Sequence, residues 1–206
     1  MTAGLLLVDL QNDFLHPDGA YHRGGAANPN AEGLVTRVAE LAATAREARV
    51  PVVATRFTLV PGPDGEPIVA DHLRRLRPFL RRGDFAEGAW GHAVVDELLP
   101  VDGSVDKIVY SAFRHTRLEW LLRSFGVDRL VVAGIVTNGG VASTVRDAHS
   151  RGFEVDVVGD CCAAFDRAVH EATLTSFTGV ANVMNAREAM EVVRRGRSAE
   201  RKGGAT

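Results

Sequence analysis

The sequence is poor in cysteine and has no long hydrophobic run. Its 206 residues include two cysteines, Cys161 and Cys162, which are adjacent and therefore cannot form an ordinary disulfide bond. The apolar run nearest the start, at residues 5–8, ends at Asp9 and is too short for a signal peptide or a membrane span. We therefore expect a cytoplasmic protein that does not associate with a membrane.

The sequence also lacks an excess of charge of one sign. Lys and Arg number 24 and Asp and Glu number 26, which gives a formal net charge of −2. A nucleic acid would require a basic surface, so we expect no nucleic-acid partner. The short basic run at residues 74–77 is interpreted as a solvated face or a contact between subunits.

Sequence motifs for the common cofactors are missing. No Gly-x-Gly-x-x-Gly follows the first apolar run, and no phosphate-binding P-loop is present. The seven histidines are scattered and show no spacing typical of metal ligands. We predict a protein without cofactor or metal whose partner is a small-molecule substrate.

Apolar segments of strand length alternate with segments of helical periodicity. The strand-like segments are residues 5–8, 51–55, 105–110, 130–135, 153–158 and 180–183. This alternation predicts an α/β fold in which helices cover both faces of a parallel sheet. Because no repeat or second core is visible, we predict a single domain over residues 1–196 and a disordered tail at residues 197–206.

The segment at residues 130–149 is the clearest strand, turn and helix of the chain. We expect Asn138 to cap the helix, and Gly139 and Gly140 to let the backbone approach a ligand closely. Free N–H groups at such a turn would bind an anion above the carboxyl end of the sheet. Alternatively, the two glycines serve only to turn the chain tightly.

Two charged residues follow or interrupt apolar strand segments. Asp9 ends the first segment, and Lys107 lies within the third. A buried charge is costly unless it is paired, so we predict that the two side chains meet above the sheet and face the glycine turn. The alternative is that they are two unrelated surface residues.

Three ordered blocks of the sequence resemble a known family. They are DLQNDF at residues 9–14, KIVYSAF at 107–113, and GIVTNGGV at 134–141 followed by STVRDA at 143–148. These blocks, with DCCAA at 160–164, resemble the isochorismatase-like (cysteine hydrolase) superfamily over residues 4 to about 185. The resemblance implies a three-layer αβα sandwich with a six-stranded, mainly parallel, Rossmann-like sheet. It also implies a homo-oligomer, either a dimer or a tetramer.

The resemblance implies catalytic roles for two residues, and the third catalytic residue of the family is missing from this sequence. Most members use an Asp, a Lys and a nucleophilic Cys, and Asp9 and Lys107 fall on the first two positions. Gly140 stands at the position of the thiol, so no acyl-enzyme can form there. Cys161 and Cys162 match a different block and are interpreted as small buried hydrophobic residues.

We predict a hydrolase that acts on a small polar metabolite without a thiol. The best specific hypothesis is vinyl-ether hydrolysis of the isochorismate type, in which Asp9 protonates the enol-ether carbon and water captures the resulting cation. One alternative is hydrolysis of an amide or ureide C–N bond by directly activated water. Another is a catalytically inactive relative that binds a small molecule or a protein partner.

Five further residues are candidates for substrate binding. Phe14, Trp90 and Phe113 are predicted to form apolar walls, and Arg56 to hold a substrate carboxylate. His115 is predicted to lie in the site, in part because isochorismatase-like sequences often have His at that position. The alternatives are core packing for the aromatic residues, a salt bridge for Arg56 and a backbone hydrogen bond for His115.

Overall fold

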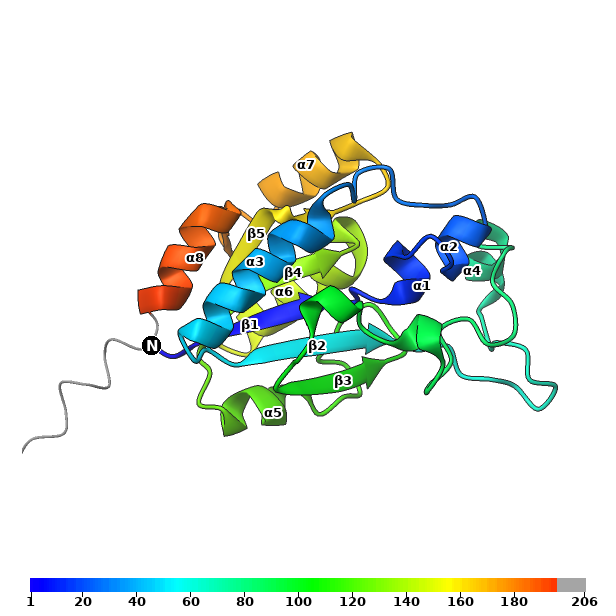
Figure 1. Ribbon diagram of the computed structural model, residues 1–206, viewed down its shortest axis with the longest axis horizontal. Coiled ribbons are helices and arrows are strands. Elements are labelled where there is room, and N and C mark those ends of the chain that lie inside the picture. The colour runs from blue at the N-terminus through cyan, green and yellow to red at the C-terminus, as the bar shows by residue number, and fades with distance from the viewer. Residues whose placement is uncertain (196–206) are drawn as a thin grey trace, which may run out of the picture.

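The computed structural model describes residues 1–195 of the chain. Within this range six strands form one sheet in the order β3-β2-β1-β4-β5-β6, and every neighbouring pair is parallel (Figure 1). The predicted six-stranded parallel sheet is therefore confirmed. The strands are β1 (Ala3–Val8), β2 (Val52–Phe57), β3 (Gly103–Lys107), β4 (Arg129–Ile135), β5 (Glu154–Ala163) and β6 (Asn182–Met184). The tail predicted at residues 197–206 lies outside the described residues.

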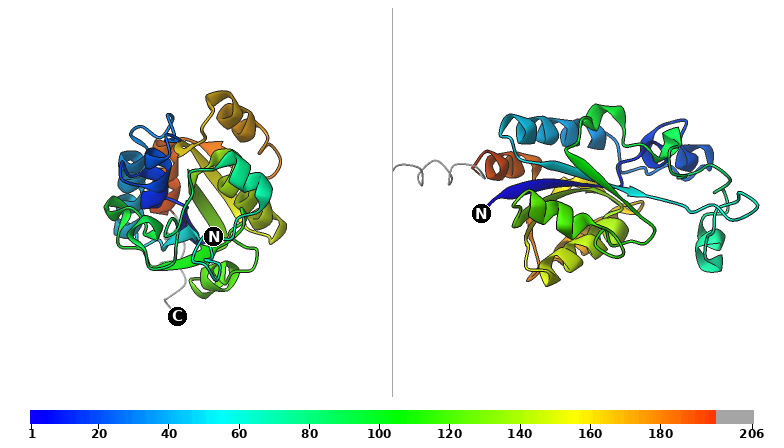
Figure 2. Two further views of the ribbon diagram at one scale, coloured as in Figure 1. Left: turned by 90° about the vertical axis from the view of Figure 1, so that its right-hand side faces the viewer. Right: turned by 90° about the horizontal axis from the view of Figure 1, so that it is seen from below.

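Helices cover both faces of the sheet (Figure 2). One face carries α3 (Leu34–Glu47) and α8 (Ala186–Arg195), and the other carries α5 (Leu118–Ser124) and α6 (Ala142–Ser150). The other helical segments are α1 (Asn12–Leu15), α2 (Ala20–Arg23), α4 (Asp71–Leu76), α7 (Arg167–Thr175) and the short turns η1 (Trp90–His92), η2 (Asp96–Leu98) and η3 (Thr137–Val141). The three-layer arrangement follows from the alternation of apolar strands and amphipathic helices.

Strand β1 shows how the sequence produces two cores. All six of its residues are buried, because helices cover both faces of a parallel sheet. Leu5 and Leu7 pack into the core under α3 and α8, whereas Leu6 and Val8 pack into the core under α5 and α6. The side chains alternate because successive residues of a strand point to opposite faces.

The structure corrects three local predictions. The strand predicted at residues 153–158 continues to Ala163 in β5. The strand predicted at residues 105–110 instead spans Gly103–Lys107, because its pairing with β2 stops at Lys107 and the half-exposed Ile108 and Tyr110 lie beyond it. Asn138 does not cap α6: it lies inside the η3 turn, in which the Val141 N–H group bonds the Val136 carbonyl. The helical turn thus begins before Asn138, which leaves this residue no capping position.

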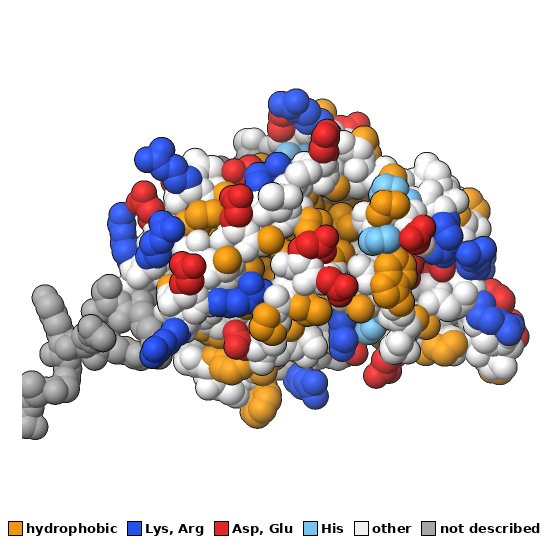
Figure 3. Space-filling view, viewed as in Figure 1, with side chains coloured by type: hydrophobic (Ala, Val, Ile, Leu, Met, Phe, Trp, Pro, Cys, Tyr) orange, Lys and Arg blue, Asp and Glu red, His pale blue; other side chains and the backbone are white. Residues whose placement is uncertain are grey.

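The irregular chain between β2 and β3 lies beyond the carboxyl ends of the strands. It carries α4 and approaches α1 and α2 at the same end of the molecule (Figures 1 and 2). Figure 3 shows positive and negative side chains interspersed over one face of the molecule. Among residues 1–195, no helix combines the length and the apolar character that crossing a bilayer requires.

Candidate active site

The carboxyl ends of β1, β3 and β4 bring three predicted site residues together. In a sheet of this strand order the chain leaves β1 and β4 in opposite directions, which opens a crevice above them. Asp9 follows β1, Lys107 ends β3, and Gly140 lies in the turn after β4. All three line one cavity.

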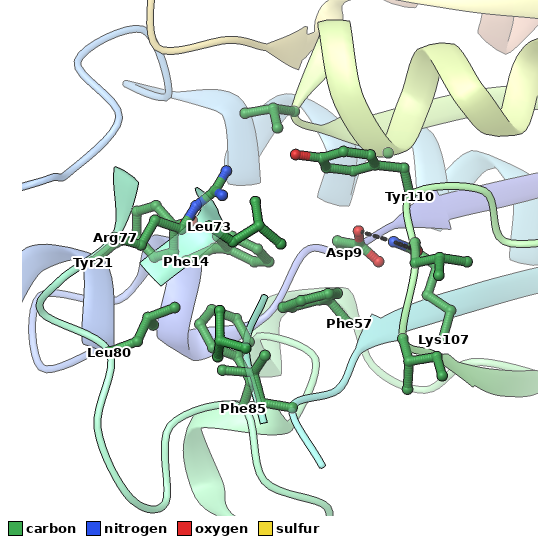
Figure 4. Close-up of a pocket in the computed structure, with 16 residues that line it drawn as sticks. Asp9, Phe14, Tyr21, Phe57, Leu73, Arg77, Leu80, Phe85, Lys107 and Tyr110 are labelled. Carbon is green, nitrogen blue, oxygen red and sulfur yellow. Dashed lines mark hydrogen bonds and ion pairs between the residues drawn. The ribbon is translucent and has the colours of Figure 1, made fainter. Parts of the chain in front are cut away.

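Asp9 and Lys107 form a buried ion pair. The distance between Asp9 Oδ2 and Lys107 Nζ is 2.6 Å, and the two residues expose 4% and 2% of their surfaces (Figure 4). Thr55, on the strand between them, donates a hydrogen bond of 2.7 Å from Oγ1 to Asp9 Oδ1. Lys107 Nζ also donates to the Val109 carbonyl at 3.1 Å. Burial makes these partners necessary, because an unpaired charge here would be costly.

Burial also changes the acidity of Asp9. Desolvation raises the pKa of this carboxyl group above its ordinary value of 3.8, although Lys107 and Thr55 act in the opposite direction. A raised pKa brings a carboxyl group closer to the pH at which it can exchange protons with a substrate.

Close backbone approach explains the glycines beside Asp9. Gly134 has φ of 141°, and a Cβ atom there would lie 2.2 Å from the Val8 carbonyl oxygen, so no other residue fits. A Cβ atom on Gly140 would lie 3.0 Å from Asp9 Oδ2 and 3.2 Å from the Ile135 carbonyl oxygen. The absence of a side chain at residue 140 thus leaves Asp9 in its present position.

Only one of the two glycines of the predicted anion-binding turn lies at the cavity. Gly140 lines the cavity, but Gly139 does not. The Gly139 N–H group already donates to the Val136 carbonyl at 2.9 Å, so it is not available to an anion. The physical reason is that this bond spans only three residues and closes a tight turn at the start of η3, which directs the N–H group back into the turn.

The cavity above the ion pair has a volume of about 200 Å³ and mostly apolar walls. Aromatic and aliphatic side chains that form its walls include Phe14, Tyr21, Phe57, Leu73, Leu80 and Phe85 (Figure 4). The aromatic rings pack on one another, and the Phe14 centroid lies 4.8 Å from Tyr21 and 4.5 Å from Phe85. A concave apolar pocket with a few polar groups is the usual form of a small-molecule site.

Arg77 and two tyrosines form the second polar part of the cavity. Arg77 Nε donates a hydrogen bond of 2.5 Å to the hydroxyl oxygen of Tyr21. Burial raises the pKa of Tyr21, so this phenol is neutral at physiological pH. Figure 4 shows Arg77 across the cavity from Asp9, with the Tyr110 hydroxyl directed toward the side on which Arg77 lies.

Asp13 holds the segments that form the cavity walls. Its buried carboxylate accepts hydrogen bonds from the Ala20 N–H group at 2.9 Å and from the Phe85 N–H group at 2.7 Å. Phe85 has φ of 52°, a left-handed conformation that is unfavourable for a bulky residue. The bond to Asp13 therefore stabilises an otherwise strained wall of the site.

Four residues predicted to bind substrate do not line this cavity. Arg56 Nε pairs with Asp106 at 2.7 Å, and Phe113 is buried in the core, where its ring packs against Phe153. Trp90 is half exposed and packs edge-on against His16. His115 is exposed and itself has a left-handed backbone conformation, with φ of 59°. Phe14 alone of the five candidates lines the cavity.

Sequence reasoning missed most of the cavity walls. Tyr21, Arg77 and Phe85 lie in short helices and irregular segments, where hydrophobic periodicity carries little information. Arg77 ends the basic run that was interpreted as a solvated face or a subunit contact. The length of the connection between β2 and β3 was the available signal, because long connections often form binding loops.

The two cysteines are not suited to act as nucleophiles. Cys161 and Cys162 are buried in β5. Burial raises the pKa of Cys161 to about 12 and raises that of Cys162 further still. A thiol of this kind is almost entirely protonated at neutral pH and is inert. Across the described residues no group of three or more His, Cys, Asp or Glu side chains is placed to hold a metal ion.

A parallel sheet with a buried Asp–Lys pair at its switch point, below an apolar cavity, defines an α/β protein with an enzyme-like site. The model of the Isochorismatase domain matches residues 3–188, so the chain belongs to the isochorismatase family of hydrolases.

Named relatives of this family hydrolyse amides. A ureidoacrylate amidohydrolase of Methylobacterium radiotolerans is 33% identical over 187 residues, which cover 85% of this chain and 72% of that protein. A ureidoacrylate amidohydrolase of Pseudomonas syringae pv. syringae is 33% identical over 179 residues, covering 82% and 70%.

Solved structures agree with the fold. A cysteine hydrolase from Pseudomonas syringae pv. phaseolicola superposes with a TM-score of 0.79 and 26% identity, covering 94% of this chain and 93% of that one. The N-carbamoylsarcosine amidase of Thermoplasma acidophilum gives a TM-score of 0.69 and 28% identity, with coverage of 90% and 97%.

Proposed function

We propose that the protein hydrolyses a C–N bond of a small amide or ureide, and that water rather than a thiol attacks the carbonyl carbon. The observation that carries this proposal is the buried Asp9–Lys107 pair at the floor of the cavity, 2.6 Å apart, beside a glycine at residue 140. The names of the relatives, ureidoacrylate amidohydrolase and N-carbamoylsarcosine amidase, support this reaction over vinyl-ether hydrolysis.

Asp9 acts as the base in this reaction. Its carboxylate takes a proton from water while the water oxygen bonds to the carbonyl carbon, and the carbonyl π electrons move to oxygen. The Lys107 ammonium stabilises the negative charge that develops there, in a site of low dielectric. Asp9 then returns the proton to the leaving nitrogen, the C–N bond breaks, and the products are a carboxylic or carbamic acid and an amine or ammonia.

Vinyl-ether hydrolysis is the second candidate. The observation that favours it is the burial of Asp9, which raises the pKa of this carboxyl group and so suits it to hold and deliver a proton. That reaction also needs no thiol. The two candidates require opposite protonation states of Asp9, base for the amide and acid for the vinyl ether.

The test is product release from a panel of amides, ureides and isochorismate. Ammonia release from an amide or ureide, lost by a factor of about 10² to 10⁴ in Asp9→Asn, is expected. Asp18→Asn is the matched control, because this exposed carboxylate lies outside the cavity. Pyruvate release from isochorismate without ammonia release would replace the proposal by the second candidate. If no compound of the panel were hydrolysed, a catalytically inactive relative that binds a small molecule or a protein partner would be the better description.

Self-association is a further part of the proposal. The family resemblance implies a dimer or tetramer, and several large apolar side chains, including Ile68, Leu76 and Trp120, are exposed on the isolated chain. Light scattering coupled to size-exclusion chromatography is expected to give a mass at least twice the 22.1 kDa of one chain. A monomer at micromolar concentration would contradict it.

A further inference from the structure

Arg77 is a cation in an apolar cavity without an acidic partner. Among residues 1–195, no carboxylate lies within salt-bridge distance of its guanidinium group. Its Nε donates a hydrogen bond to the hydroxyl of Tyr21, a neutral phenol. The positive charge of Arg77 is therefore not neutralised by the described part of the protein.

Other half-buried arginines of the chain have carboxylate or backbone carbonyl partners. Arg37 and Arg46 donate to backbone carbonyl groups. Arg56 pairs with Asp106 at 2.7 Å, and Arg129 pairs with Asp156 at 2.6 Å. Such pairing is expected, because a partly buried charge loses hydration and requires an opposite charge in compensation. Arg77, by contrast, lines the cavity and donates to a neutral hydroxyl group.

The apolar walls separate Arg77 from the ion pair. Figure 4 shows Arg77 on one side of the cavity and Asp9 with Lys107 on the other, with Phe14, Phe57 and Leu73 among the side chains between them. A ligand that reaches from Asp9 to Arg77 must therefore place apolar atoms against these walls. A small and wholly polar molecule would leave the rings without contacts.

We propose that the substrate is an amide or ureide in which a cyclic or branched apolar body separates the scissile bond from a carboxylate, and that Arg77 binds this carboxylate. The guanidinium group is suited to this role, because its planar donors match the two oxygens of a carboxylate. The identity of the scissile bond in this inference rests on the proposed C–N hydrolysis. The recognition of a carboxylate by Arg77 is independent of that reaction.

Binding is tested without turnover. Isothermal titration calorimetry would compare 4-methylbenzoate with 4-methylbenzyl alcohol, its uncharged counterpart, and with acetate, an anion that lacks the apolar body. Wild-type protein is expected to bind 4-methylbenzoate at least roughly tenfold more tightly than either of the others. Equal affinity for the anion and the alcohol, or for the anion and acetate, would overturn the inference.

The variants assign the anion preference to one residue. Arg77→Met removes the charge and keeps the length of the side chain, and is expected to abolish the preference for 4-methylbenzoate over the alcohol. Arg75→Met is the matched control on the same segment, because Arg75 is exposed and lies outside the cavity. Arg77→Lys, which keeps the charge, is expected to retain part of the preference. If Arg77→Met weakened both ligands equally, the role of Arg77 would be structural and the inference wrong.

Turnover separates this inference from the proposed function. 4-(Ureidomethyl)benzoate carries a ring between its ureide and its carboxylate, and benzylurea lacks the carboxylate. Arg77→Met is expected to raise KM for the first compound by roughly tenfold or more with little change in kcat, and to leave benzylurea unaffected. If Arg77-dependent binding were observed but no amide or ureide were hydrolysed, the proposed reaction would fail while anion recognition by Arg77 would stand.

Discussion

Asp9 and Lys107 lie 2.6 Å apart although β2 separates the strands that carry them. Thr55, at the carboxyl end of that intervening strand, donates to the same carboxylate, so the ends of three neighbouring strands share one polar cluster. The cluster depends on the register of the sheet, in which Val8 pairs with Thr55 and Phe57 with Lys107.

Removal of one member of the pair is expected to destabilise the protein strongly. Lys107→Met leaves a buried carboxylate without its counter-charge, and the free energy of unfolding should fall by about 3–5 kcal/mol. The double variant Asp9→Asn with Lys107→Met should recover much of this loss. Urea denaturation of the two single variants and the double variant measures the coupling, and additive effects would show that the pair is not energetically linked.

The pH dependence of stability follows from the raised pKa of Asp9. Because burial raises this pKa in the folded state, the folded protein holds the proton more tightly than the unfolded chain does. The contribution is fully present below the unfolded value of 3.8 and is lost as pH rises through the folded pKa. The unfolding free energy of wild-type protein minus that of Asp9→Asn should therefore decrease across this window in urea titrations.

The pH dependence of activity distinguishes the two candidate reactions. If Asp9 is a base, the value of kcat/KM should fall as pH drops through the folded pKa, which lies above 3.8. If Asp9 is an acid, kcat/KM should instead fall as pH rises through that value. A pH profile of kcat/KM for the substrate that is hydrolysed thus assigns the role of Asp9. A value of kcat/KM that does not change with pH in either direction would show that Asp9 takes no part in the chemistry.

A side chain at residue 140 is expected to disturb the ion pair. In Gly140→Ala the new Cβ would lie 3.0 Å from Asp9 Oδ2, which Lys107 and Thr55 hold in place, so a loss of about 1–3 kcal/mol is expected. Gly139→Ala is the control, since its Cβ would lie 3.2 Å from Val136 Cγ2 and 3.3 Å from the Tyr110 ring and would not contact the ion pair. Equal losses in thermal unfolding of the two variants would contradict a specific role for the contact with Asp9.

Asp13→Asn is expected to loosen the cavity walls. The amide can accept the hydrogen bond of Ala20 or of Phe85 but cannot satisfy both donors as the carboxylate does, so KM should rise more than kcat falls. Stability should fall by roughly 1–3 kcal/mol. Asp18→Asn again serves as the exposed control, and an unchanged KM would show that Phe85 keeps its position without Asp13.

The cysteines are expected to be dispensable. Since burial raises the pKa of Cys161 to about 12 and protects both thiols, native protein should not react with Ellman's reagent, whereas the unfolded chain should show two thiols. Substitution of both by Ala should preserve kcat/KM within about twofold, apart from effects on stability. Loss of hydrolysis in a folded double variant would assign one of them a role in the reaction.

The fold was predictable because parallel strands buried on both faces appear in a sequence as short, uninterrupted apolar runs. Asp9 and Lys107 were predictable for a related reason: a charge adjoining such a run must find a partner. Both arguments use neighbours in the sequence, and the sheet then brings the two residues together.

The cavity walls were not predictable because distant contacts fix them. Phe85 occupies its place through a hydrogen bond to Asp13, 72 residues earlier, and through ring contacts with Phe14. Phe113 and His115 show the opposite case. They lie in or beside a recognisable motif, but Phe113 is buried in the core and His115 is exposed, and neither lines the cavity. Closeness in sequence to Lys107 therefore did not predict closeness to the site.

The chemistry and the walls of this site come from different parts of the chain. The ion pair is fixed by the register of a central sheet, whereas much of the wall belongs to one continuous connection between β2 and β3. Substitutions or insertions in that connection can alter which molecules enter without moving a single strand. The hydrolytic apparatus and the range of substrates can therefore evolve independently, and proteins that share the sheet and its charged pair can diverge widely in what they consume.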